Sequence, residues 1–146
     1  MKTFSKLIIF SLILTGIFAC QREPGNLNEL RSRMEANGYI GNYRQPNGTL
    51  EKMALNLIGV NDLLIYNDDQ LHAFVFKIKD GKDPRESLDE VEGYLRRFVK
   101  FSTEEEERDA EQKWEQIKRD AKVRGQFLLI WYGDNEEDLL RVFRLF

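Results

Sequence analysis

The sequence predicts an α+β domain, in which a small, mainly antiparallel sheet packs against amphipathic helices. Asp62–Tyr66 and Leu71–Lys79 are two apolar segments separated by turn-forming residues, which is typical of a hairpin. Gln126–Tyr132 is apolar on both faces, as expected of a later strand that is covered on both sides. Between and around these strands, apolar residues recur every three or four positions, which predicts helices.

The first twenty residues have the layout of a secretory signal peptide. Lys2 and Lys6 are positively charged, Leu7–Phe18 is a short apolar run, and Ala19 is a small residue at the expected cleavage site. Cys20 is the single cysteine of the chain. The run from Leu7 to Cys20 is shorter than the about 20 apolar residues that a spanning helix needs. We therefore expect export, with an uncleaved anchor as a weaker alternative.

The Ile17-Phe18-Ala19-Cys20 ending resembles the lipobox of bacterial lipoproteins. The resemblance implies that Cys20 carries the lipid and begins the mature chain, because a free lone thiol would be unusual in an exported protein. It also implies attachment to the cell membrane or the outer membrane, outside the cytoplasm. Gln21, rather than an aspartate, favours the outer membrane in a cell that has one. A conventional signal peptide cut after Ala19 is the main alternative.

The predicted organisation is a signal peptide at residues 1–19, a tether at residues 20–26 and one domain at residues 27–146. Removing the first 19 residues, which hold two lysines and no acid, leaves 127 residues with 20 basic and 25 acidic side chains. This length fits a single core. The acidic balance argues against nucleic acid as a partner.

The first two helices are predicted by their apolar spacing and by their ends. Leu27–Ala36 is expected to end at Gly38, a residue that accepts the left-handed conformation of a helix terminus. The next helix is expected to begin with Thr49 as its cap and to end at Gly59. Its expected buried stripe is Leu50, Met53, Ala54, Leu57 and Ile58.

The second strand of the hairpin has two unequal faces. One face carries Phe74, Phe76 and Ile78. The other begins with Ala73 and Val75 and becomes polar at Lys77 and Lys79, so we expect it to be only partly covered. After this strand, Asp83 is expected to cap a helix that begins at Pro84 and ends near Phe101. Its predicted buried residues are Leu88, Val91, Tyr94, Leu95 and Phe98.

Two further helices are predicted in the C-terminal part. Thr103 and Glu106 form a capping box for a helix that is expected to stop at Gly125. Its apolar stripe is Ala110, Trp114, Ile117 and Ala121, and its last turns are expected to hold Lys118, Arg119, Lys122 and Arg124. Asp134 and Glu137 form another capping box, followed by Leu139, Val142, Phe143 and Phe146. A strand ending Trp-Tyr-Gly-Asp before a short helix looks like the end of small envelope lipoproteins.

The sequence contains no motif for catalysis, and we predict no catalytic residues, no metal and no cofactor. His72 is the only histidine, and one histidine without partners is weak evidence for a site. We therefore expect a membrane-anchored, non-enzymatic binding or structural module, for which another envelope protein is a candidate partner. The alternatives are an envelope glycan hydrolase, which needs two carboxylates about 5–10 Å apart, and a carrier of a small apolar ligand.

The aromatic content points to one candidate partner surface. Aromatic side chains usually fill cores, but exposed aromatic surface marks an interaction site. If the helices cover only one face of the sheet, the open face of the last strand would present Leu128, Ile130 and Tyr132 to a partner.

Overall fold

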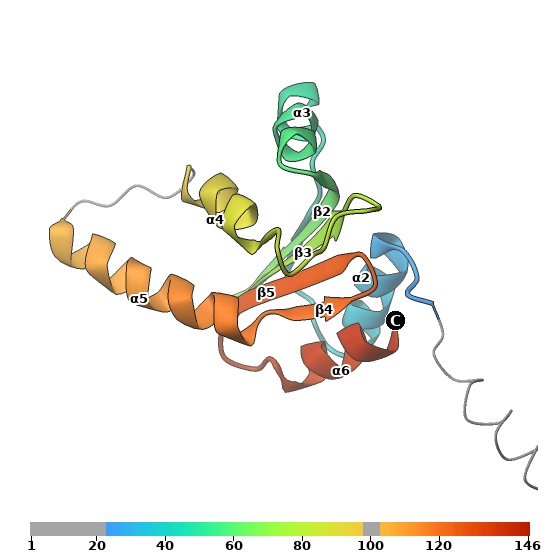
Figure 1. Cartoon of the computed structure of the whole chain (residues 1–146). Helices are drawn as coiled ribbons and strands as arrows, with labels where there is room; N and C mark the ends of the chain where they lie inside the picture. Colours follow the sequence, from blue (N-terminus) through green and yellow to red (C-terminus); the bar gives the residue numbers. More distant parts are fainter. Residues whose placement is uncertain (1–22, 98–102) are drawn as a thin grey trace, which may run out of the picture.

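The structure is a computed structural model that describes residues 23–97 and 103–146 (Figure 1). The predicted signal peptide, Cys20 and the predicted helix end near Phe101 lie outside the described residues. No described helix is both long enough and apolar enough to cross a membrane.

The α+β class is confirmed, and the sheet is larger than predicted. All its strand pairs are antiparallel, and the strand order is β1-β2-β3-β5-β4. The strands are β1 (Asn42–Arg44), β2 (Val60–Asn67), β3 (Leu71–Ile78), β4 (Lys122–Arg124) and β5 (Phe127–Gly133). The predicted hairpin is β2 and β3, and the predicted later strand is β5, which pairs with β3 at the centre of the sheet.

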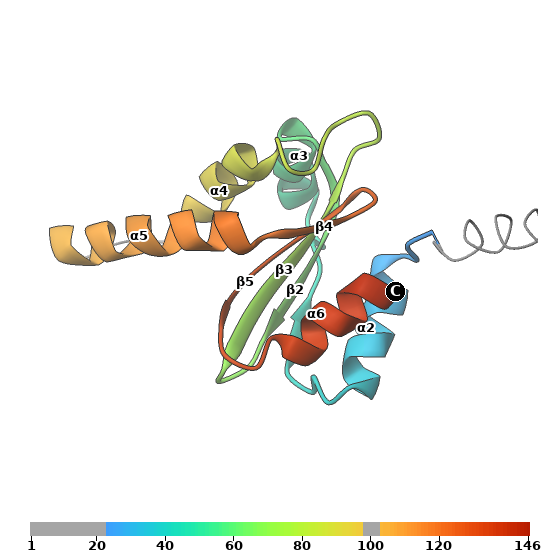
Figure 2. The same ribbon diagram turned by 60° about the horizontal axis from the view of Figure 1, so that its bottom comes forward.

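Helices cover both faces of this sheet (Figures 1 and 2). They are α2 (Leu27–Ala36), α3 (Thr49–Leu57), α4 (Leu88–Arg96), α5 (Glu104–Asp120) and α6 (Glu137–Leu145). Figure 2 shows α2 and α6 together on one side of the sheet, with α3, α4 and α5 on the other. The two faces therefore belong to two separate cores.

The first core lies between the sheet and the pair α2–α6. Its fully buried members include Leu30, Met34, Tyr66, Val75, Leu129 and Phe146. Ala73 and Val75 are only 1% exposed, so this face of β3 is covered more completely than predicted. Strand alternation sends these residues to one side because successive side chains point to opposite faces.

The second core lies between the sheet and the three remaining helices. It contains Leu55 of α3, Val91 of α4, and Phe76 and Leu128 of the central strands. Several side chains around it are only partly buried, namely Ile65, Phe74, Trp114 and Ile117. The second face is thus packed near one end of the sheet and looser near the other.

Two predicted helix boundaries are wrong. The long helix ends at Asp120 rather than at Gly125, and Lys122 and Arg124 belong to strand β4. The alternating Lys-Val-Arg segment pairs with β5, and Gly125 at φ 55° makes the turn between them. The preceding helix begins at Leu88 rather than at Pro84, because Asp83–Ser87 forms a separate turn.

Helix α3 forms where predicted, but only Ala54 and Ile58 of its predicted apolar stripe pack against the second core, and the other three residues are exposed. Leu50, Met53 and Leu57 are 83%, 58% and 87% exposed. Leu55, on the other side of the helix, is the residue that packs into the second core. The spacing correctly predicted a helix at this position. It did not predict which side of the helix is buried, because an apolar stripe shows which residues share a face and not which element packs against that face.

Candidate functional site: an apolar groove on one face of the sheet

A groove with a volume of about 510 Å³ opens on the looser part of the second sheet face. Its floor is the sheet and its walls are α4 and α5. The lining residues are Arg44, Glu51, Ile65, Phe74, Tyr94, Leu95, Ala110, Lys113, Trp114, Ile117, Ile130, Trp131 and Tyr132. Nearly all are aliphatic or aromatic, so the groove offers apolar surface that no other part of the described chain covers.

Strand pairing places the floor of the groove. Ile65, Phe74 and Ile130 are direct neighbours across β2, β3 and β5, so their side chains form a row on one face. Tyr132 continues this face toward the end of β5, where its ring stacks on His72 with centroids 4.5 Å apart. The phenol is about half exposed, and burial of the rest raises its pKa.

Ion pairs between α4 and α5 hold the walls. Arg96 contacts Glu92 of its own helix and Glu111 of α5, each at 2.7 Å. Lys118 of α5 reaches back to Asp89 and Glu92 of α4, each at 3.0 Å. Hydrogen bonds to Glu92 and Asp89 raise the pKa of Lys118. Single surface pairs contribute little, but these are cross-linked and fix how the two helices lie relative to each other.

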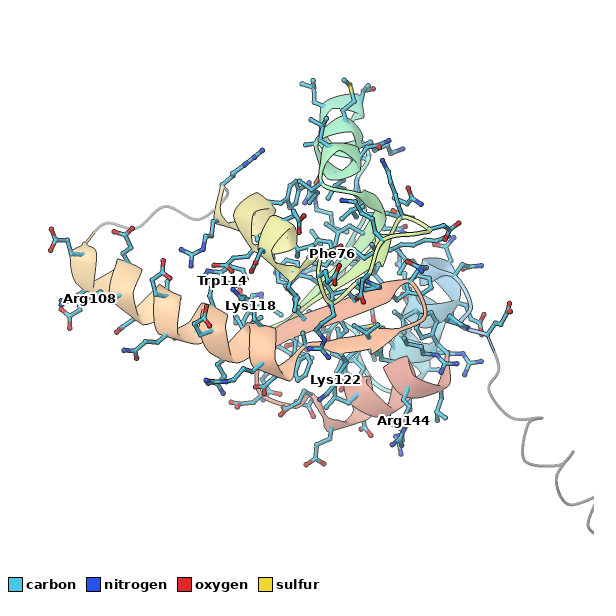
Figure 3. All side chains as sticks on the ribbon, in the orientation of Figure 1. Phe76, Arg108, Trp114, Lys118, Lys122 and Arg144 are labelled. Atoms are coloured by element: carbon cyan, nitrogen blue, oxygen red, sulfur yellow. The ribbon has the colours of Figure 1, made fainter. Side chains whose placement is uncertain are left out.

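Trp114 is the largest side chain that α5 turns toward the sheet. It is partly buried against the second core and is labelled in Figure 3. The Arg96 guanidinium lies 5.7 Å from its ring centroid. The second tryptophan of the chain, Trp131, borders the groove from β5, but its side chain packs against the first core. The fluorescence of Trp114 is therefore the intrinsic signal that reports on this site.

The polar groups of the groove lie at its rim. Arg44 of β1 and Glu51 of α3 form an ion pair at 2.6 Å. Burial raises the pKa of the nearby Tyr94 phenol, and the negative charge of Glu51 adds to the effect. Lys113 of α5 lines the groove and is exposed. The rim thus carries two cations and one carboxylate, which is enough to orient a ligand with a polar end.

Ionisable groups are few among the residues that line the groove. Glu51 is the only carboxylate among the lining residues, and it is paired with Arg44. Among residues 23–97 and 103–146, no group of three His, Cys, Asp or Glu side chains could hold a metal ion. His72 lies beside the groove, with its ring stacked on Tyr132 and with Asp68 near enough for a coulombic interaction. The arrangement is therefore suited to apolar binding.

The candidate partner surface from the sequence has a mixed position. Leu128 and Ile130 are 0% and 2% exposed, and Ile130 forms part of the groove floor. Tyr132 is the accessible member of the three. The sequence reasoning found the floor and missed the walls. The sequence did contain a signal for the walls, which is Trp114 in a long, highly charged helix. A lone aromatic residue in such a helix is expected to face an apolar neighbour.

Comparisons with protein-family models, curated proteins and solved structures found no match for this chain. No relative therefore supplies an activity or a ligand. The groove and the lipobox-like pattern of residues 17–20 are the two features on which a proposal can be based.

Proposed function

We propose that this protein is a lipid-anchored envelope lipoprotein whose domain is a non-enzymatic binding module for a small apolar ligand. The groove carries this proposal. Its volume of about 510 Å³ lies within the range of roughly 300–1,000 Å³ that is usual for small-molecule sites. Such sites combine mostly apolar walls with a few polar groups, as this groove does with Arg44 and Lys113 at its rim.

The driving force for binding is the removal of apolar surface from water. At about 25 cal/mol per Å², a ligand that covers 200 Å² of aromatic and aliphatic surface would gain about 5 kcal/mol before its ordering costs. The cross-linked α4–α5 walls reduce those costs, because a preformed site need not be ordered by the ligand. The glycan hydrolase alternative is less well supported, since Glu51 has no second carboxylate opposite it in the groove.

The groove is tested by filling it. Ala110 lines the groove on α5 and is only partly buried. The larger ring in Ala110→Phe should therefore fill the groove without disturbing either core. We expect the variant to bind 1-anilinonaphthalene-8-sulfonate, an apolar anionic probe, at least about tenfold more weakly, as measured by the increase in the fluorescence of the probe on binding. Ala36→Phe is the matched control, because Ala36 is exposed at the end of α2, away from the groove.

Equal probe affinity in Ala110→Phe, Ala36→Phe and the unchanged protein would contradict groove binding. Circular dichroism and thermal unfolding would establish that both variants fold.

The anchor is tested at Cys20. We expect Cys20→Ala to abolish palmitate incorporation and membrane association without changing thermal unfolding, because Cys20 precedes every residue of the two described cores. The measurements are radiolabelling, cell fractionation and a melting curve. Continued labelling of the variant would exclude lipidation at this residue.

A further inference from the structure

Helix α3 presents its apolar side to solvent. Leu50, Met53 and Leu57 lie within about 60° of one another around the helix, and all three are more than half exposed. The helix contacts the body of the domain through Leu55, which is buried in the second core, and through Ala54 and the following Ile58, which pack against that core. Figures 1 and 2 show α4 next to α3, and residues 23–26 on the other side of the molecule from α4.

A chain of contacts connects α3 to the start of the described chain. The Pro24 ring lies against Gly125 in the β4–β5 turn. The next residue, Gln126, accepts a hydrogen bond from the Ile78 N–H. Lys79 in turn donates its N–H to the carbonyl of Gly59, directly after α3. The C-terminal end of α3 and the attachment point of the tether thus share one end of the sheet.

The tether is too short to move this end far from a bilayer. Cys20 precedes Pro24 by four residues, which span at most about 14 Å. Between Pro24 and the end of α3 lie three strand spacings, from β4 to β2, or about 14 Å. A lipid on Cys20 would therefore lie within about 28 Å of the last turn of α3, near enough for that turn to reach the surface of the same bilayer.

The charges beside α3 suit an anionic surface. The Lys79 ammonium donates to the Asn56 carbonyl at 3.0 Å, and the Lys82 side chain lies directly against Gly59. Both lysines are thus held beside Leu57. Apolar residues next to basic ones are typical of helices that lie in the interface of an anionic bilayer.

We propose that the apolar face of α3, made of Leu50, Met53 and Leu57, docks on the lipid bilayer that carries the Cys20 anchor. The proposal rests on the proposed lipid anchor. Three side chains on a nine-residue helix bind a membrane only weakly alone, but the anchor converts their contact into an intramolecular step at high effective concentration. The same three side chains supply only a fraction of the about 800 Å² per partner of a stable dimer.

The test uses the full lipidated protein in vesicles of phosphatidylcholine and phosphatidylglycerol. Leu57→Cys and Lys52→Cys are matched variants, because both residues are exposed and they lie about 140° apart around α3. Each new thiol is labelled with an environment-sensitive fluorophore, and quenching by nitroxide-labelled lipids is measured. We expect at least about twofold stronger quenching at position 57 than at position 52, and a smaller difference in vesicles without phosphatidylglycerol.

Equal quenching at the two positions, or none, would overturn docking. Docking would also be overturned if quenching at position 57 depends on the amount of protein per vesicle and not on the amount of nitroxide-labelled lipid. That result would identify a second copy of the chain as the occupant. The unchanged protein separates this failure from failure of the anchor. A lipidated Cys20 has no free thiol, so thiol labelling of the unchanged chain would mean that the anchor itself is absent.

Discussion

The two faces of the sheet are built from the same strands but are covered differently. On the first face, α2 and α6 bury a continuous set of side chains, and polar groups at its edge are joined by hydrogen bonds. The Tyr39 hydroxyl accepts from the Leu139 N–H at 2.7 Å and donates to the Asn135 carbonyl at 2.8 Å. On the second face, α4 and α5 leave a groove of about 510 Å³, and α3 keeps its apolar side in solvent.

The difference separates stability from binding within one small domain. A closed face gains from burial and from the absence of voids. An open apolar groove forgoes part of that gain, and its surface remains available to a ligand. The first face therefore holds the strands in place, and the second presents their other side as the floor of a site.

Truncating neighbouring residues of β5 should give the largest effect and compare the two faces directly. Leu129 is fully buried in the first core, so Leu129→Ala should cost about 2–5 kcal/mol of unfolding free energy. Ile130 is the floor of the groove, and Ile130→Ala should cost less, near the lower end of that range, because the vacated space joins an open groove rather than forming an enclosed cavity.

Urea unfolding measures both free-energy losses. Leu145→Ala is the control at an exposed position, and it should change the unfolding free energy by less than about 0.5 kcal/mol. A larger loss for Ile130→Ala than for Leu129→Ala would contradict the assignment of the closed face.

A smaller, pH-dependent effect should come from Asp68 in the β2–β3 turn. Although partial burial opposes it, hydrogen bonds from the Tyr66 hydroxyl and the N–H groups of Gln70 and Leu71 lower the pKa of Asp68 below 3.8. A lowered folded-state pKa stabilises the domain above about pH 4, and this contribution is lost as the pH falls through the folded value. Asp68→Asn should lose about 1 kcal/mol at pH 7.

The variant should also lose less stability than the unchanged protein between pH 7 and pH 3. Urea unfolding of both proteins at the two pH values measures this difference. The contributions of the other carboxylates are the same in both proteins and therefore cancel. An identical pH dependence would mean that the Tyr66–Asp68 bond does not form in solution.

The sequence predicted the central elements because their signals are local. Alternation in Leu71–Lys79 and the apolar run Gln126–Tyr132 were sufficient for β3 and β5, and the helix stripes were sufficient for the five helices. Strand β4 was missed, because Lys122–Arg124 follows a helical pattern directly and becomes a strand only by pairing with β5. Edge strands of three residues carry little signal of their own.

The site was less predictable than the fold for a related reason. Ile130 and Tyr132 were recognised as one strand face, but the walls depend on how far α5 stands from the sheet. That distance follows from the Arg96 and Lys118 ion pairs between helices, which spacing along the chain does not encode. The exposure of Leu50 and Leu57 was not predicted for the same reason. Amphipathic spacing shows that a helix has an apolar side but not which element that side packs against.

The most direct test of the division between the two faces is an amide chemical-shift titration with 1-anilinonaphthalene-8-sulfonate. The account predicts shift changes in α5 around Trp114, in α4 around Tyr94 and in β5 around Ile130 and Tyr132. Amides of α2 and α6 should remain unchanged, because these helices close the first face. Shift changes that centre on α2 and α6, and leave the Trp114 region unchanged, would contradict the account.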